Sequence, residues 1–250
     1  MKINSDLNIL GSLQDLSLIT LFWAEKSRGS KSLEDNHVYT SIKTDASFKR
    51  FRRAINGTLL KFNNKETNSL VNSFLSADSV SQDSLLMLFW NASVNNDLLH
   101  YLNNKVFFPA YYSGRLMIKT KEVEACIKEL RETEVLIKKW SAKTVYTVSY
   151  KYLALLKKFN LLEGNTHKKI LHPYLSDSMF VLFLYWLNVT EIKPNLLESN
   201  WLTYSFCEQS FFIERLMQKK FSKYYQFTYT GDNLKIETLI SYKEIYYAVK

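Results

Sequence analysis

Basic side chains are the residues of this sequence with the clearest chemistry. Lys49, Arg50, Arg52 and Arg53 place four cations within five residues. Guanidinium groups bind phosphate oxygens through pairs of N–H donors, so this spacing indicates contact with a polyanion. The alternative is that the four side chains lie over neighbouring apolar surface and keep their charged ends in water.

A second basic group lies between residues 138 and 169. Lys143, Thr147, Lys151, Ala154 and Lys158 share one side of a helix if the segment is helical, because they recur at intervals of three and four. Two lysine pairs stand before and after this helix. The expected nucleic-acid contacts are therefore Lys49, Arg50, Arg52, Arg53, Lys138, Lys139, Lys143, Thr147, Lys151, Lys158, Lys168 and Lys169.

The helix that must position this second group has a strong apolar side. Ser141 is an expected N-cap, and Gly164 is available for the left-handed conformation that follows a helix. The apolar side consists of residues at spacings of three and four: Val145, Val148, Tyr152, Leu155 and Phe159. Over residues 119–176 the pattern predicts a long helix, a break, this second helix and a basic extended arm.

Such a centre is typical of a winged helix-turn-helix that presents its second helix to DNA. The alternative is a surface helix of an all-helical bundle with a solvated lysine face. Base readout usually uses Arg, Asn or Gln, whereas this face offers Lys, Thr and Tyr150. We therefore expect phosphate contacts with weak sequence preference.

The composition favours a mainly α fold of two helical lobes with winged-helix-like elements, a helix-turn-helix and a small β-hairpin. Gly (6) and Pro (3) are scarce, and 46% of residues are hydrophobic. We expect a lobe over 1–113 with helices at 11–26, at 45–62, which is the basic helix, and at 97–108, closed by Pro109. The second lobe, 114–250, contains the centre 119–176 and a hairpin at 224–239, where alternating residues flank a Gly-Asp-Asn turn. We interpret that hairpin either as a second wing or as a plain α+β end of the lobe.

The charge balance points to a polyanionic partner. The net charge is +9, and it divides into +4 for residues 1–120, +4 for 121–190 and +1 for 191–250. Two cysteines and no apolar leader favour a cytoplasmic protein. The most apolar run, 179–187, is much shorter than the roughly 20 residues that a membrane span needs, so it predicts a buried helix.

Catalytic signatures are missing from the sequence. The four histidines lack HExxH spacing, and neither GxxxxGK[ST] nor GxSxG occurs. Acidic residues 122–134 alternate with cations and read as an ion-paired helix face. We expect no enzyme activity, no cofactor, no metal and no small-molecule substrate.

The central motifs resemble the BrxA family. Trp140-Ser141-x-x-Thr144, the run from Tyr152 to Gly164, Lys168-Lys169-Ile170-Leu171-x-Pro173 and Leu175-Ser176-Asp177 carry the resemblance, with the basic segment 45–50 and the 211–220 helix at either side. The family comprises accessory proteins of BREX phage-defence systems. The resemblance implies a mostly helical cytoplasmic protein that binds double-stranded DNA without catalysis, with other BREX proteins as further partners.

Two alternatives remain open at this point. The family has been likened to an RNA-binding antitermination fold, so the same basic surface could bind RNA. The aromatic side chains could instead make the protein a scaffold that docks onto other defence proteins.

Overall fold

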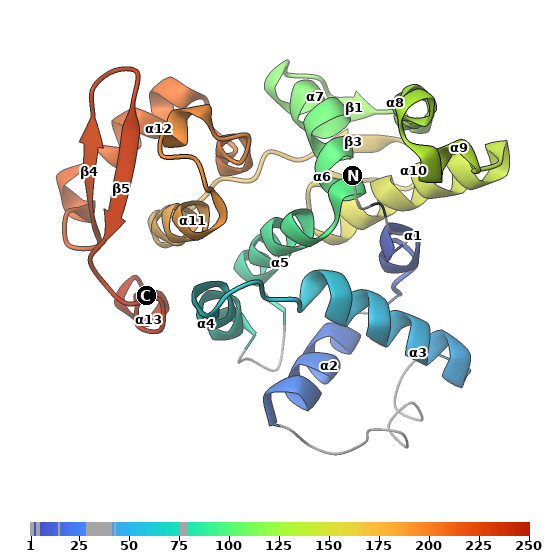
Figure 1. Cartoon of the computed structure of the whole chain (residues 1–250), viewed down its shortest axis with the longest axis horizontal. Coiled ribbons are helices and arrows are strands. Elements are labelled where there is room, and N and C mark those ends of the chain that lie inside the picture. Colours follow the sequence, from blue (N-terminus) through green and yellow to red (C-terminus); the bar gives the residue numbers. More distant parts are fainter. Residues whose placement is uncertain (1–2, 4–5, 15, 29–41, 43, 76–79) are drawn as a thin grey trace. The chain divides into compact units, whose positions relative to one another are not determined.

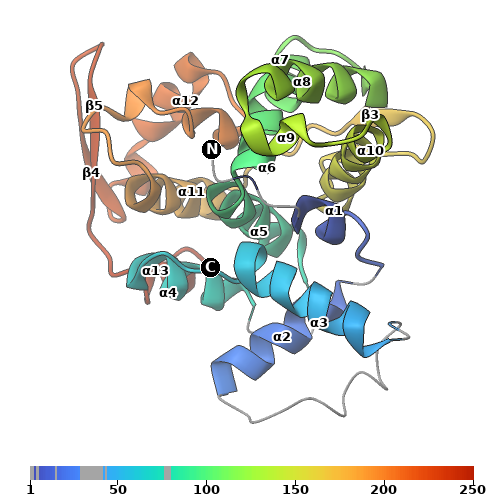
Figure 2. The same ribbon diagram turned by 45° about the vertical axis from the view of Figure 1, so that its right-hand side comes forward.

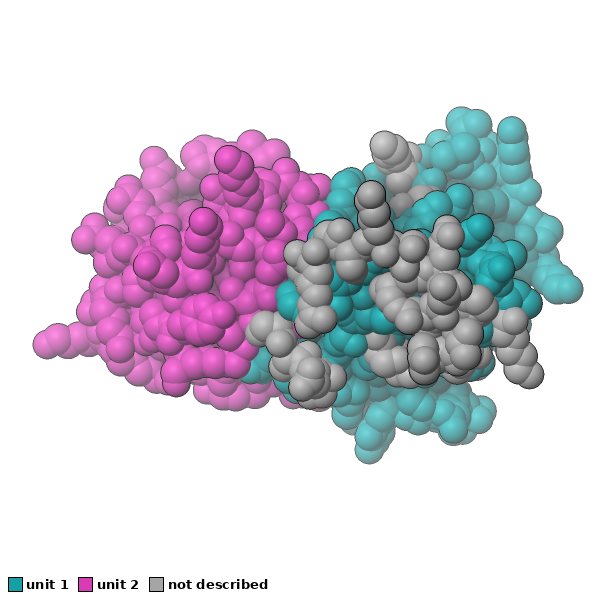
Figure 3. Space-filling model, turned by 90° about the horizontal axis from the view of Figure 1, so that it is seen from below, with its two compact units in different colours: residues 1–61, 77–171 teal, residues 62–76, 172–250 magenta. Residues whose placement is uncertain are grey.

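The computed structural model of the chain describes residues 3, 6–14, 16–28, 42, 44–75 and 80–250. The protein is mainly helical, and its described residues include five short strands. Two compact units make up the chain (Figure 3), and neither is continuous in sequence. Unit 1 comprises residues 1–61 and 77–171, and unit 2 comprises residues 62–76 and 172–250.

Unit 1 contains the basic helices and a three-stranded sheet (Figure 1). Its elements are, in chain order, α1 (Asp6–Leu10), α2 (Ser17–Arg28), α3 (Asp45–Ala54), the π-helical η2 (Ile55–Leu59), α5 (Gln82–Asn95), α6 (Asp97–Leu102), the π-helical η3 (Asn103–Phe107), α7 (Phe108–Tyr112), β1 (Met117–Ile118), α8 (Thr120–Thr133), α9 (Val135–Lys138), α10 (Ala142–Lys158), β2 (Leu162–Glu163) and β3 (Lys168–Ile170).

The sheet of unit 1 is antiparallel, in the order β1-β3-β2. Met117 pairs with Lys169, and Leu162 pairs with Ile170. β1, which precedes α8, and β2, which follows α10, therefore pair with opposite edges of β3. α10 also packs against α8 and α1, and α1 lies between α10 and α3 in both ribbon views (Figure 2).

Unit 2 surrounds an apolar helix. Its elements are α4 (Lys65–Phe74), α11 (Asp177–Thr190), the 3-10 helices η4 (Leu196–Glu198) and η5 (Leu202–Ser205), α12 (Gln209–Leu216), the 3-10 helix η6 (Lys219–Phe221), β4 (Tyr225–Tyr229), β5 (Leu234–Thr238) and α13 (Ile245–Ala248). Residues 179–187 of α11 are all buried, and α11 packs against α4, α13 and β5. In the described part of the chain, no helix has both the length and the apolar composition that a membrane crossing requires.

Unit 2 also contains a buried arginine. Arg215 donates to the carbonyl oxygen of Leu175 at 2.6 Å and to Asp177 Oδ1 at 3.1 Å, and its guanidinium lies 4.5 Å from the ring centre of Phe180. The other carboxylate oxygen of Asp177 accepts from Lys220 at 2.5 Å. These contacts join α12 to the first turn of α11.

Several expected elements differ from the structure. The helix expected over 11–26 begins only at Ser17, as α2, and residues 11 and 12 form a turn after α1, a short helix that the sequence did not predict. The helix expected over 45–62 becomes π-helical at Ile55. Pro109 stands in the first turn of α7 and ends no helix, because a first-turn position requires no N–H donor.

The division of the chain also differs from a boundary near residue 113. α8 and α10, which follow that point, belong to the same unit as α1 and α3 because α10 packs directly on α1. α4, which precedes it, belongs to unit 2 because it packs on α11 and α13. The hairpin expected over 224–239 is present as β4 and β5, which pair from Tyr225–Thr238 to Tyr229–Leu234.

Candidate nucleic-acid interface

Helix α10 forms as its sequence predicts. The Ser141 hydroxyl accepts the backbone N–H of Thr144 at 3.2 Å, so Ser141 is the N-cap. Its apolar side is buried at Val145, Val148 and Tyr152. The helix ends one residue before Phe159, and the left-handed residue that follows is Asn160, with φ of 55°. Gly164, expected in that role, lies instead in the turn between β2 and β3.

A buried hydrogen-bond chain fixes α10 to the core of unit 1. The Tyr152 hydroxyl donates to Asn103 Oδ1 at 3.0 Å, and Asn103 Nδ2 donates to Ser93 Oγ at 3.1 Å. Ser93 in turn donates to the carbonyl oxygen of Phe89 at 2.8 Å. All three side chains are buried, and such connected polar groups favour one arrangement of the packed helices. α10 is therefore held in position by α5 and η3.

The exposed side of α10 is rotated from the face that the sequence predicts. Lys143 is exposed, but Thr147, Lys151 and Lys158 are only half-exposed. α1 packs beside them, and Gly11 approaches the backbone of Lys151 so closely that a Cβ at Gly11 would lie 2.2 Å from the carbonyl oxygen.

Four residues on one side of α10 form what we call the open stripe: Lys143, Tyr146 and Tyr150, which are exposed, and Lys157. Tyr146 is 55% exposed and Tyr150 is 44% exposed. Lys157 is half-exposed and extends to Asn165 Oδ1, at 2.6 Å. The stripe therefore has a lysine at each end and two tyrosine rings between them.

Sequence reasoning missed Tyr146 and Lys157. The signal for Lys157 was its spacing of seven residues from Tyr150, which itself follows Lys143 by seven, because residues seven apart share a helix face. The sequence prediction instead chose Lys151 and Lys158, which lie at the other edge of the polar side of α10. The packing of α1 could not be read from the local pattern of α10.

The turn after β2 brings a further lysine toward the end of α10. Gly164 adopts φ of 84°, and a Cβ there would lie 2.2 Å from the carbonyl oxygen of His167, so the turn requires glycine. Lys168 is only 7% exposed and donates to the Gly164 carbonyl oxygen at 3.1 Å. Lys169 points outward and pairs with Glu163 at 3.2 Å across the hairpin.

Four lysines form a cluster where α10 meets this hairpin, and we call Lys151, Lys157, Lys158 and Lys168 the lysine cluster. Burial lowers the pKa of Lys158, and the charges of Lys151, Lys157 and Lys168 lower it further. Burial also lowers the pKa of Lys168, together with the charge of Lys157. Among the described residues, no carboxylate forms an ion pair with these four. An anion bound at this place would relieve their mutual repulsion.

The basic cluster of α3 is only partly available. Lys49, Arg50 and Arg53 are exposed. Arg52 instead pairs with Glu25 at 2.8 Å, and its guanidinium lies 5.4 Å from the ring centre of Phe48. Arg52 thus ties α3 to α2, which matches the alternative of cations that cover apolar surface.

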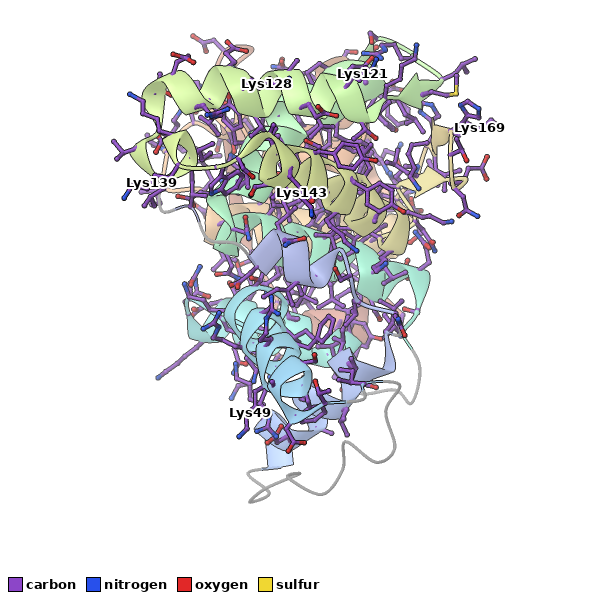
Figure 4. All side chains as sticks on the ribbon, turned by 90° about the vertical axis from the view of Figure 1, so that its right-hand side faces the viewer. Lys49, Lys121, Lys128, Lys139, Lys143 and Lys169 are labelled. Carbon is purple, nitrogen blue, oxygen red and sulfur yellow. The ribbon has the colours of Figure 1, made fainter. Side chains whose placement is uncertain are left out.

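The remaining expected contacts lie in the turn before α10. Lys138 and Lys139 are exposed at the end of α9. Figure 4 shows Lys139, Lys143 and Lys169 along the row formed by α9, α10 and the hairpin, whereas Lys49 stands on α3, apart from that row.

The net charge of the protein comes from unit 1. The segments of unit 1 contain 24 Lys and Arg against 15 Asp and Glu, a net charge of +9. The segments of unit 2 contain nine of each, so their net charge is zero. The positive net charge expected to attract a polyanion therefore comes from the segments of unit 1.

Comparison with known proteins adds the family. No curated protein and no solved structure matches the chain. The family model BrxA matches residues 30–184, which is more than half of the chain and includes α3, α10 and the hairpin β2–β3. The chain therefore belongs to the BrxA family.

Proposed function

We propose that the protein is a non-catalytic accessory factor of a BREX anti-phage defence system and that it binds double-stranded DNA through unit 1. Membership of the BrxA family suggests a BREX-associated defence protein. The observation that carries the DNA-binding part is the lysine cluster, which shares Lys157 with the open stripe of α10 and has no carboxylate in an ion pair with it among the described residues.

The order of elements supports a winged helix-turn-helix. β1 is followed by α8, the short α9, α10 and the hairpin β2–β3, and the sheet order β1-β3-β2 joins the first strand to the hairpin. In this interpretation α10 is the recognition helix, and residues 162–170 are the wing. The open stripe would enter the major groove, and the lysines would contact the phosphates on either side.

Lysine side chains dominate this surface, so the binding energy is expected to come mainly from phosphates. Lys143 and Lys157 stand at the two ends of the open stripe, and Lys138 and Lys139 extend the row. Each phosphate contact releases counterions, which makes the affinity fall steeply with salt.

The test is binding to a labelled duplex of random sequence across a salt series. One double variant, Lys143→Ala with Lys157→Ala, removes two charges from the open stripe. A matched control, Lys235→Ala with Lys243→Ala, removes two exposed charges from unit 2. We expect the first variant to reduce the slope of log K against log salt by about 1.8, or about 0.9 for each lost phosphate contact. The control should leave the slope unchanged.

Two results would contradict the proposal. Equal losses in the two double variants would mean that net charge alone attracts the DNA. Tighter binding of an RNA hairpin than of duplex DNA in direct competition would favour the antitermination-like alternative.

A second function is favoured by the surface of unit 2. This unit has zero net charge and exposes large apolar side chains that include Tyr174 (74%), Ile192 (97%) and Tyr247 (68%). Neutral surfaces with exposed aromatic residues are suited to protein partners. We propose that unit 2 contacts another BREX protein. Recovery of such a protein by the tagged full chain after nuclease treatment tests this, and its loss on nuclease treatment would show that DNA bridged the two.

A further inference from the structure

The middle of the open stripe lacks the side chains that read base edges by paired hydrogen bonds. Arg, Lys, Asn and Gln usually make these contacts in the major groove. On α10 the lysines stand at the ends of the stripe, whereas the middle is formed by Tyr146 and Tyr150. The half-exposed neighbours Thr147 and Ala154 add methyl groups on the same side. The centre of this surface is therefore largely apolar.

An apolar protein surface can distinguish thymine from the other bases through its methyl group. The C5-methyl of thymine is the apolar group that natural bases present in the major groove, and aromatic or small apolar side chains pack against it. Tyr146 and Tyr150 are four residues apart, so both rings lie on one face of the helix. The Lys151 ammonium lies 5.8 Å from the ring centre of Tyr150, which leaves a cation beside the apolar centre for a flanking phosphate.

We propose that α10 selects thymine-containing duplexes by packing Tyr146 and Tyr150 against thymine methyl groups. This inference rests on the proposed function, because it requires α10 to enter the major groove. It goes beyond weak, phosphate-driven binding, since it names the base and the chemical group that is read. Duplexes rich in A·T pairs would bind more tightly than duplexes rich in G·C pairs at the same length and salt.

The experiment changes the methyl group and little else. The full chain is titrated with four duplexes of equal length. Two are A·T-rich, one with thymine and one with deoxyuridine in its place. Two are G·C-rich, one with cytosine and one with 5-methylcytosine. Loss of each buried methyl group should weaken binding about fourfold, from the transfer free energy of one such group. Methylation of cytosine, which places a methyl at the same position in the groove, should strengthen binding to the G·C-rich duplex.

A double variant assigns the effect to the two rings. Tyr146→Ala with Tyr150→Ala should bring the ratio of thymine to deoxyuridine affinity close to 1 and leave the salt slope unchanged, because the lysines remain. Tyr247→Ala, which removes a more exposed ring from unit 2, should retain the wild-type ratio. Photocrosslinking with 5-iodouracil at the thymine positions gives a readout on the unmutated protein, with the adduct expected on Tyr146 or Tyr150.

The outcomes separate this inference from the function on which it rests. Equal affinity of the wild-type protein for thymine and deoxyuridine duplexes would overturn methyl recognition and leave DNA binding intact. A ratio that persists in the double variant would overturn the role of the two tyrosines. Failure to bind any duplex at low salt would overturn the proposed function itself.

Discussion

Replacement of Gly11 by alanine should loosen α1 from the helix that we propose to bind DNA. A Cβ at this position would lie 2.2 Å from the carbonyl oxygen of Lys151 and 2.8 Å from its carbonyl carbon. Both atoms belong to the backbone of α10, so no side-chain rotation can relieve the clash. Ordinary contact begins near 3.4 Å, and α1 must therefore move by about 1 Å.

The expected loss of stability follows from two opposing effects. Overpacking of this kind costs about 1–3 kcal/mol. Alanine also restricts the unfolded chain more than glycine does, which offsets about 0.4–1 kcal/mol of that cost. We expect a net decrease of about 1–2 kcal/mol in the free energy of unfolding of unit 1.

Gly57→Ala is the matched control. It makes the same chemical change in the same unit, but the nearest atom to a Cβ there, Asp6 Oδ2, is 3.7 Å away. Its stability should stay constant or rise by up to about 1 kcal/mol. Urea titration measures both variants, and hydrogen exchange of the α10 amides locates the change in unit 1. Equal stability of the two variants would refute the argument that Gly11 is required by close backbone approach.

Three further predictions concern buried and paired groups. Tyr152→Phe should lower the free energy of unfolding by about 1–3 kcal/mol, because Asn103 Oδ1 loses its buried donor; an unchanged urea midpoint would contradict this. Arg215→Ala should destabilise unit 2 by about 2–4 kcal/mol in thermal unfolding, since a buried carbonyl loses its donor, whereas Lys220→Ala removes an exposed pair and should cost less than about 1 kcal/mol. The hydrogen bond from Lys220, together with Arg215, lowers the pKa of Asp177 below its ordinary 3.8, so the carboxylate stabilises the fold above that pH. The stability difference between wild type and Asp177→Asn should therefore be constant near neutral pH and shrink as the pH falls below about 4; a difference that grows in acid would reverse the assigned sign.

The sequence predicted correctly those helices and strands that are determined by residues close together in the chain. The N-cap at Ser141 and the apolar side of α10 follow from residues within one or two turns, and the hairpin β4–β5 follows from its own turn residues. The residue that ends α10 was predicted less well. Gly164 was expected to adopt the left-handed conformation after the helix, but Asn160, which also tolerates that conformation, adopts it there.

The exposed surface was harder to predict because distant segments determine it. The exposure of Lys151 depends on the turn after α1, which lies about 140 residues earlier in the chain. Arg52 belongs to the densest basic run, but its partner Glu25 comes from another helix. A charge pattern therefore identified the basic helices, and tertiary contacts decided which cations remain at the surface.

The division of unit 2 into two separated segments has a consequence for synthesis on the ribosome. α4 is translated about 100 residues before α11, on which its apolar side packs. At about 5–20 residues per second, Leu70 and Val71 wait for about 5–20 s before their partner helix exists. All segments of unit 1 have been translated by residue 171, so the charged unit can close first. At that stage α11 and α13, on which α4 packs, have not yet been translated, so the apolar side of α4 still lacks its partners within unit 2.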